Sequence, residues 1–178
     1  MGTSLSVNGV SYNLLKLLGH GKSGYSYLAE RDRRKFVLKQ IHHEPCTYYT
    51  FGNKIEAEQH DYGCLINAGI RIPKMLDIDL ANERVLKEYI PGPTIYDLVK
   101  EDAVKPEYFH QVRHMARQAQ EKGLNIDYFP TNFVVCEETL YYVDYECNTY
   151  MEQWNFENWG NLYWWKSPEF LAYVKNHP

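Results

Sequence analysis

The segment Pro91-Gly92-Pro93 constrains the fold most, because it divides the chain into two differently patterned parts. Before it, short alternating or β-branched runs predict strands, whereas after it longer runs with helical periodicity are more frequent. Pro-Gly-Pro can continue neither a helix nor the interior of a sheet. We therefore expect an α+β protein with a first region over residues 1–90, a second over residues 91–178, and a hinge at residues 88–93.

The first region contains the pattern of an antiparallel sheet with one helix. Five strands are predicted, at residues 10–19, 25–29, 35–41, 75–79 and 85–90. Residues 54–68 repeat apolar side chains at helical spacing. The expected buried face of this helix consists of Ile55, Tyr62, Leu65 and Ile66.

The glycine-rich stretch Gly19–Gly24 between the first two predicted strands fits one of two phosphate-binding motifs. A P-loop would need glycine at position 16, which is a lysine, and a helix directly after Ser23. The pattern G-x-G-x-x-G, formed by Gly19, Gly21 and Gly24, instead matches a turn between strands that can cover phosphate groups. Without other observations, an ordinary hairpin turn explains the three glycines equally well.

Lys39 and Glu58 strengthen the phosphate hypothesis. Lys39 lies inside the strand pattern 35–41, fifteen residues after Gly24, and Glu58 lies four residues before Tyr62 on the apolar side of the predicted helix. A carboxylate there can form an ion pair with Lys39 and orient its amine. The alternative is that both are ordinary surface residues.

The second region carries an Asp, an Asn five positions later and a second Asp after a short apolar run: Asp127, Asn132 and Asp144. Phosphoryl transfer from ATP uses one carboxylate to orient the attacking hydroxyl, and an amide with a second carboxylate to bind Mg²⁺. Residues 133–135 and 140–143 predict a hairpin that places Asn132 and Asp144 at neighbouring strand ends. The pattern D-x-x-x-x-N alone is weak, so its weight depends on the residues upstream.

In order and spacing, these elements resemble a protein-kinase-like fold over roughly residues 12–150. The stretches Glu58–Pro73 (E-x₁₀-G-I-x-I-P) and Glu88–Thr94 (E-Y-I-x-G-P-T) are most similar to small atypical kinases, namely the RIO kinases and the minimal kinase of the tRNA-modifying KEOPS complex. The sequence Asp144-Tyr145-Glu146 resembles the D-F-E motif of choline and aminoglycoside-type kinases. The chain is also similar to short bacterial serine/threonine kinases.

This resemblance implies a two-lobed fold, with a five-stranded sheet and one helix in the first lobe and a truncated, mainly helical second lobe. It implies ATP and Mg²⁺ as cofactors and a serine/threonine protein kinase as the leading activity. It also assigns roles residue by residue: Gly19, Gly21 and Gly24 over the phosphates, Lys39 on the phosphates, Glu58 orienting Lys39, Glu88 and Ile90 at the adenine, Asp127 as the base, and Asn132, Asp144 and Glu146 at the metal.

The chain departs from the kinase pattern at three points. Asn125-Ile126 replaces the His-Arg pair, so control by a phosphorylated activation loop is not expected, and Phe129 replaces a lysine that contacts the γ-phosphate. No A-P-E segment follows Asp144. Substrate recognition would then depend on a protein partner, the aromatic C-terminal segment or a small molecule. A small-molecule hydroxyl kinase and a nucleotide-binding regulatory module without turnover remain alternatives.

Charge and composition limit the cellular compartments and the classes of partner that we expect for this protein. The net charge of −4 gives no overall electrostatic case for nucleic-acid binding. The four cysteines form no C-x-x-C pair, and no apolar run reaches membrane-spanning length. We expect no signal peptide, because a basic segment followed by an apolar one is not found at the N-terminus. We therefore expect a cytoplasmic protein with reduced thiols, ATP as a ligand, and a protein substrate or partner.

Two helical features complete the second region. Thr94 is expected to cap a helix to about residue 100, and Pro106 to begin a helix to about residue 122. His110 and His114 lie four apart there, a spacing that can bind zinc, but no third ligand is evident and a packed or solvated pair is favoured. The C-terminal aromatic residues predict one or two helices in the core, with an exposed docking patch as the alternative: Trp154, Phe156, Trp159, Leu162, Trp164, Trp165, Phe170 and Leu171.

Overall fold

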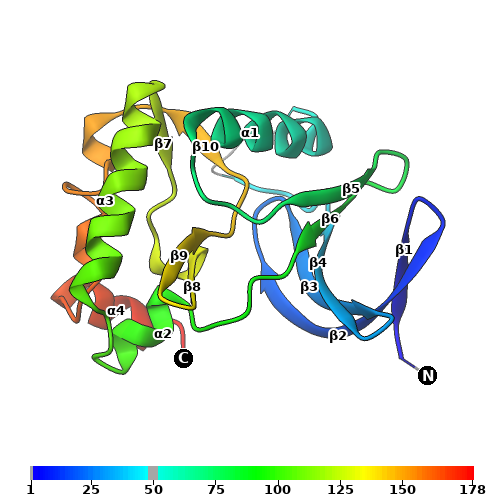
Figure 1. The fold of residues 1–178 in the computed structure, drawn as a ribbon, viewed down its shortest axis with the longest axis horizontal. Helices are drawn as coiled ribbons and strands as arrows, with labels where there is room; N and C mark the ends of the chain where they lie inside the picture. Colours follow the sequence, from blue (N-terminus) through cyan, green and yellow to red (C-terminus); the bar gives the residue numbers. More distant parts are fainter. Residues whose placement is uncertain (1, 48–51) are drawn as a thin grey trace. The chain divides into compact units, whose positions relative to one another are not determined.

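The computed structural model describes residues 2–47 and 52–178. Contacts divide the chain into two compact units, one formed by Met1–His60 with Pro73–Tyr89 and the other by Asp61–Ile72 with Ile90–Pro178. The first unit contains an antiparallel sheet, and the second contains helices with two small sheets (Figure 1). The predicted α+β class is therefore confirmed.

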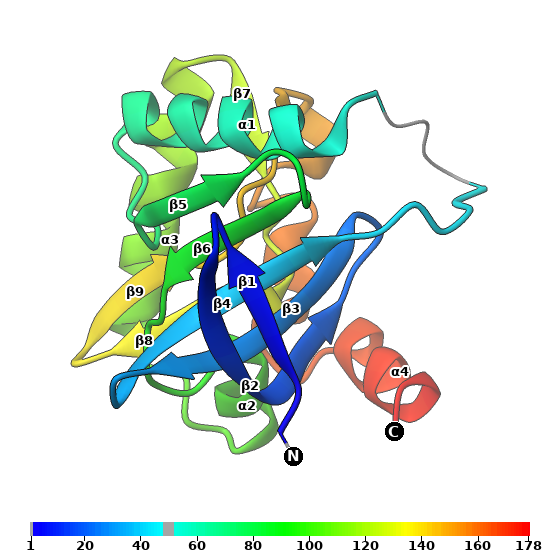
Figure 2. The same cartoon turned by 90° about the vertical axis from the view of Figure 1, so that its right-hand side faces the viewer.

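The first unit is organised around a curled sheet with the strand order β1-β2-β3-β4-β6-β5, in which all neighbours are antiparallel (Figure 2). Its strands are β1 (Ser4–Val7), β2 (Val10–His20), β3 (Gly24–Arg31), β4 (Arg34–Ile41), β5 (Met75–Asp79) and β6 (Arg84–Glu88). The prediction of five strands was wrong, because β1 adds a sixth. Asn8 and Gly9 join β1 to β2 with φ values of 47° and 81°, the backbone that a two-residue hairpin turn requires.

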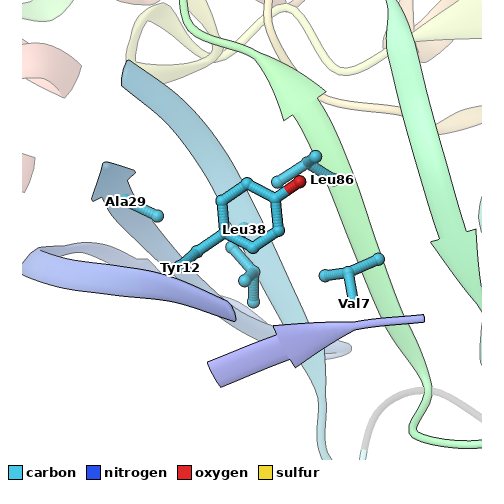
Figure 3. Packing of buried hydrophobic residues seen from close by; sticks show 5 residues of the cluster. All are labelled: Val7, Tyr12, Ala29, Leu38 and Leu86. Carbon is cyan, nitrogen blue, oxygen red and sulfur yellow. The ribbon is translucent and has the colours of Figure 1, made fainter. Parts of the chain in front are cut away.

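The core of this sheet gathers side chains from strands that are distant in sequence. Figure 3 shows Val7, Tyr12, Leu38 and Leu86 converging from β1, β2, β4 and β6, with Ala29 of β3 beside them. Each of the five is at most 8% exposed. Burial of β1 against this cluster supplies a reason for the short strand to remain ordered.

Helix α1 spans Lys54–Ala68, as predicted. Ile55, Glu58 and Leu65 are buried and Tyr62 is half-buried, but Ile66 is 52% exposed, so its assignment to the buried face was wrong. Successive helical residues are about 100° apart, and a stripe centred on Leu65 leaves the next position outside it.

The other two helices predicted before residue 125 lie in the second unit. Thr94 forms a capping box with Asp97 at the start of α2 (Ile95–Lys100). Helix α3 (Pro106–Glu121) has proline in its first turn and ends just before Gly123, whose φ of 69° suits the reversal. Across residues 2–47 and 52–178, every helix falls short of the length and apolar character needed to cross a bilayer.

Two small antiparallel sheets shape the second unit. Strands β8 (Phe133–Cys136) and β9 (Thr139–Tyr142) form the predicted hairpin. Strands β7 (Leu124–Ile126) and β10 (Cys147–Thr149) form a second pair that was not predicted. Description of this region as mainly helical was therefore incorrect, because helices and small sheets are mixed. A three-residue strand is too short to show an alternating pattern in the sequence.

The aromatic C-terminal segment is partly core and partly surface. It contains two 3₁₀ turns, at Glu152–Trp154 and Gly160–Tyr163, followed by α4 (Pro168–Asn176). Phe156, Trp164 and Phe170 are at most 1% exposed. Three other members are surface residues, which corrects their assignment to the core: Trp154, Trp165 and Leu171.

Candidate functional site

The first group of candidate residues is a buried ion pair in the sheet unit. Lys39 of β4 donates from Nζ to Oε1 of Glu58 on α1. The two residues are 6% and 5% exposed, and Glu58 Oε2 has no hydrogen-bond partner among the described residues. The structure thus contains the predicted pair and leaves a buried carboxylate oxygen that a further donor could satisfy.

The three glycines of the G-x-G-x-x-G stretch have different surroundings. Gly19 lies near the end of β2, Gly21 in the turn, and Gly24 begins β3. A Cβ added at Gly19 would meet nothing within 4 Å, and at Gly21 only the Gly24 oxygen at 3.9 Å. At Gly24 it would lie 2.6 Å from the backbone oxygen of Gln40. Gly24 is therefore required by packing against β4, whereas Gly19 and Gly21 leave the backbone open to approach.

Lys54 is a buried residue near this turn that the sequence did not single out. Its Nζ donates to the backbone oxygen of His42 at 2.5 Å and of Lys22 at 3.4 Å, and the residue is 5% exposed. It therefore connects the beginning of α1 to the glycine-rich turn. No sequence signal distinguishes it, because a lysine in the first turn of a helix is normally solvated.

The predicted adenine-binding residues lie at the end of the sheet unit and the start of the second. Glu88 is the last residue of β6; its N–H donates to the Lys74 oxygen (2.9 Å), and its Oε2 accepts from the Lys74 N–H (3.1 Å). Ile90 is 9% exposed. Their role at an adenine stays a prediction.

The second group of candidate residues, in the other unit, is centred on the loop that follows β7. Asp127 Oδ1 accepts a hydrogen bond from the Phe129 N–H at 3.1 Å, and Asn132 Nδ2 donates to the Asp127 backbone oxygen at 3.3 Å. These bonds hold the loop between Asp127 and the 3₁₀ turn Pro130–Asn132. Because Asn132 donates through its nitrogen, its amide oxygen is the atom it can offer to a cation.

The hairpin β8–β9 and the pair β7–β10 bring the other carboxylates to this loop. Val143 N–H donates to the Asn132 oxygen at 2.9 Å, so Asp144 follows directly at the end of the hairpin, as predicted. Cys147 pairs with Ile126, which places Glu146 and Asp127 at adjoining strand ends. Asp144 Oδ1 accepts from the Tyr145 N–H at 2.8 Å.

Burial and neighbouring charge affect the ionisation of Asp127. Desolvation raises the pKa of its carboxyl, the carboxylates of Glu146 and Asp144 raise it further, and the hydrogen bond from Phe129 opposes them. A cation bound between these groups would remove the repulsion. Carboxylates and an amide oxygen are donors that Mg²⁺ prefers, so these residues fit the predicted ion in donor type.

Tyr142 links the two strand ends and was not predicted as a site residue. Its hydroxyl accepts from the Asp127 N–H at 3.3 Å and donates to the Glu146 backbone oxygen at 2.7 Å. The residue is fully buried, and desolvation raises the pKa of the phenol well above its ordinary value. Strand alternation places Tyr142 inward, but nothing in the sequence indicates what its hydroxyl contacts.

Asn125 and Phe129 mark the departures from the kinase motif. Asn125 is 5% exposed and donates to the Met151 oxygen at 2.8 Å, while its Oδ1 has no partner among the described residues. The Phe129 ring packs against three aromatic rings of the C-terminal segment, those of Trp159, Tyr163 and Tyr173. Both departures are therefore built into the local packing.

The structure thus contains two separate groups of candidate residues: a buried lysine–glutamate pair in one unit and, in the other, Asp127 and Asn132 with the carboxylates of Asp144 and Glu146 nearby. No protein-family model matches the chain, and comparison with curated proteins found no match. The function is therefore inferred from these residues.

Proposed function

We propose that the protein is an ATP- and Mg²⁺-dependent phosphotransferase with a kinase-like fold, whose lobes correspond to residues 1–90 and 91–178. The favoured acceptor is a serine or threonine hydroxyl of a protein. The observation that carries this proposal is the buried ion pair between Lys39 and Glu58. The six-stranded sheet with α1 supports it as a suitable first lobe.

Burial of the Lys39–Glu58 pair calls for a functional reason. Removing two charges from water costs several kcal/mol per ion, and an apolar pair of similar volume is often at least as stable. In a phosphotransferase, Lys39 grips the α- and β-phosphates and Glu58 fixes the position of the amine. The unsatisfied Oε2 of Glu58 fits a site whose remaining hydrogen bonds come with the ligand.

Asp127 is the group that we assign to the acceptor hydroxyl. Its carboxylate orients the hydroxyl and accepts its proton as the bond to phosphorus forms. The raised pKa favours this task, since a more basic carboxylate is a better proton acceptor. Asn132 and Asp144, assisted by Glu146, would hold Mg²⁺, which neutralises charge on the transferred phosphoryl group.

Two other functions have specific support. Phe129 packs among aromatic rings, so the phosphate-contacting lysine of protein kinases has no equivalent at this position, which favours a small-molecule acceptor. Asn125 in place of histidine favours a regulatory module that binds nucleotide without turnover.

The test is ADP formation from ATP, with and without Mg²⁺, together with phosphate incorporation into the protein and a peptide library. Wild type is compared with Lys39→Met, and Lys35→Met on the exposed part of the same strand is the matched control. Because Lys39→Met leaves Glu58 unpaired, the double variant Lys39→Met/Glu58→Met removes both charges of the pair and still lacks the lysine that would bind the phosphates.

We expect Mg²⁺-dependent turnover in wild type and Lys35→Met, and its loss in both variants at position 39. Nucleotide-induced thermal stabilisation without ADP formation would favour the regulatory module instead. Wild-type turnover in the double variant would contradict the proposed role of Lys39.

A further inference from the structure

A cluster of two histidines and a glutamate lies at the glycine-rich turn of the sheet unit. His20 ends β2, while His42 and Glu44 follow β4. Within residues 2–47 and 52–178, this is the one group of three His, Cys, Asp or Glu residues whose ligand atoms all lie within 4.8 Å of one another. We propose that His20, His42 and Glu44 bind a divalent transition-metal ion of the zinc class.

The spacing of the ligand atoms fits such an ion. Zinc bonds of about 2.0–2.1 Å in a tetrahedral arrangement place neighbouring ligand atoms about 3.3 Å apart. Nε2 of His20 lies 2.9 Å from Glu44 Oε2, and Nε2 of His42 lies 3.7 Å from the same oxygen. The two separations bracket the required value, so small side-chain adjustments suffice. Two imidazoles and one carboxylate, with a fourth position open to water, form a known type of zinc site.

Tyr25 of β3 supplies the outer contacts that orient these ligands. Its hydroxyl donates to Oε1 of Glu44, the carboxylate oxygen that does not face the two imidazoles. Its ring stacks on His20 with centroids 4.2 Å apart and meets the ring of His42 edge-on at 5.2 Å. Outer partners of this kind fix the orientation of metal ligands.

Metal binding would change the hydrogen bonds of His42. Its ring contacts the Gly21 oxygen through Nε2 at 2.8 Å, and Nδ1 accepts from the Glu44 N–H at 3.2 Å, which assigns the proton to Nε2. Coordination through Nε2 requires that proton on Nδ1, so both hydrogen bonds are exchanged for one metal bond. The proposed ion therefore competes with a bond that holds the turn at Gly21.

The chain also contains histidines that serve as matched controls. His43 is adjacent to His42 but pairs with Glu83 and has a side chain 66% exposed. His110 and His114 are exposed on α3, with a spacing that can bind zinc weakly. His20 and Glu44 are themselves about half exposed, with side chains 48% and 46% accessible, so a solvated ion pair without metal is the competing explanation.

The test is calorimetric titration of the metal-free full chain with Zn²⁺. We expect one ion per chain, loss of this binding in His20→Asn and in His42→Asn, and about 10-fold weaker binding in Tyr25→Phe, which retains the ring but not the hydroxyl. His43→Asn and the double variant His110→Asn/His114→Asn should bind like wild type. Unchanged affinity in His20→Asn and His42→Asn, or loss in the α3 variant, would overturn the proposal.

Two further measurements separate the site from unfolding and from the cysteines. Thermal melts without metal establish that each variant is folded before its titration is interpreted. The Co²⁺-loaded protein should show the absorption of a tetrahedral nitrogen and oxygen site, lost in His20→Asn. A thiolate-to-cobalt charge-transfer band in its place would assign the ion to cysteine and refute the site.

Discussion

Two aspartates in different parts of the molecule have opposite electrostatic environments. Asp79, at the end of β5, is 2% exposed, and three hydrogen bonds reach its carboxylate, from the Asn82 side chain (2.9 Å), the Asn8 N–H (2.8 Å) and the Asn82 N–H (2.9 Å). These donors lower the pKa of its carboxyl to about 2. At Asp127, desolvation and two neighbouring carboxylates raise the pKa instead.

The opposite pKa shifts distinguish a carboxylate that stabilises the fold, Asp79, from one suited to accept a proton in a reaction, Asp127. The Asp79 carboxylate accepts hydrogen bonds from the β1–β2 turn and from the β5–β6 turn, so its negative charge stabilises the fold. At Asp127, desolvation and the neighbouring carboxylates outweigh the hydrogen bonds with the Phe129 N–H and the Asn132 side chain, so its ionised form carries a net electrostatic cost. Proteins retain such costs mainly at functional sites, which supports the proposed role of Asp127.

The largest expected effect is on turnover. Asp127→Asn keeps the acceptor oxygen for the Phe129 N–H but removes the proton acceptor, so ADP formation should fall by about 10²–10⁴-fold. Nucleotide binding should persist, measured by thermal shift with Mg-ATP. Asp79→Asn, in the turn network, is the matched control and should retain turnover at temperatures where it is folded. Equal activity of Asp127→Asn and wild type would contradict the assignment of the base.

The second prediction concerns Asp79 and acid stability. Because its pKa is lowered in the folded protein, the carboxylate stabilises the fold above the ordinary value of 3.8, and this contribution is lost as the pH falls toward about 2. Asp79→Asn should therefore melt several degrees lower than wild type at neutral pH. Melting curves across a pH series should show that gap closing between about pH 4 and pH 2. A gap independent of pH would mean that charge is not the cause.

Much of the sheet could be predicted because its signals are local. Alternation of apolar side chains and the positions of turn residues predicted five strands that the structure contains, β2 to β6. Apolar side chains at helical spacing predicted α1. Strand β1 was missed although Asn8-Gly9 is a strong hairpin signal, since the apolar run before it is only four residues long. The turns at Asp32-Arg33 and Glu137-Glu138 also join predicted strands, but they adopt positive φ values without a glycine, so their backbone geometry could not be predicted from glycine positions.

The candidate site was predictable as a set of residues but not as a contact network. Spacing alone placed Glu58 on the face of α1 that reaches Lys39, and the β8–β9 hairpin brought Asn132 to Asp144. The β7–β10 pair, which brings Glu146 to Asp127, joins segments about twenty residues apart through strands of three residues. Such pairing depends on tertiary contacts, and so do the hydrogen bonds of Tyr142. Tertiary contacts cannot be predicted from the local spacing of apolar residues in the sequence.

The third prediction addresses that network through Tyr142. Tyr142→Phe preserves the buried ring but leaves the Asp127 N–H and the Glu146 oxygen without this hydroxyl. The expected loss of stability is about 1–3 kcal/mol, which corresponds to a few degrees in melting temperature. Turnover should fall more than for Tyr141→Phe, the neighbouring half-exposed tyrosine used as control. Identical melting of the two variants would show that the hydroxyl does not hold the strand ends.

The smallest expected effect is a change in melting temperature for Asp127→Asn, opposite in sign to the change expected for Asp79→Asn. Since its pKa is raised in the folded protein, the ionised carboxylate costs stability at neutral pH, and wild type regains it as the pH falls through that raised pKa. Asp127→Asn presents an amide to Glu146 and Asp144 in place of a third negative charge. The variant should melt about 2–4 °C above wild type at neutral pH, roughly 1 kcal/mol, with the difference shrinking in acid.

Adding Mg²⁺ should also reduce the difference in melting temperature, because the proposed ion relieves the same repulsion in wild type. A variant that melts below wild type at neutral pH would show that Asp127, like Asp79, serves the fold.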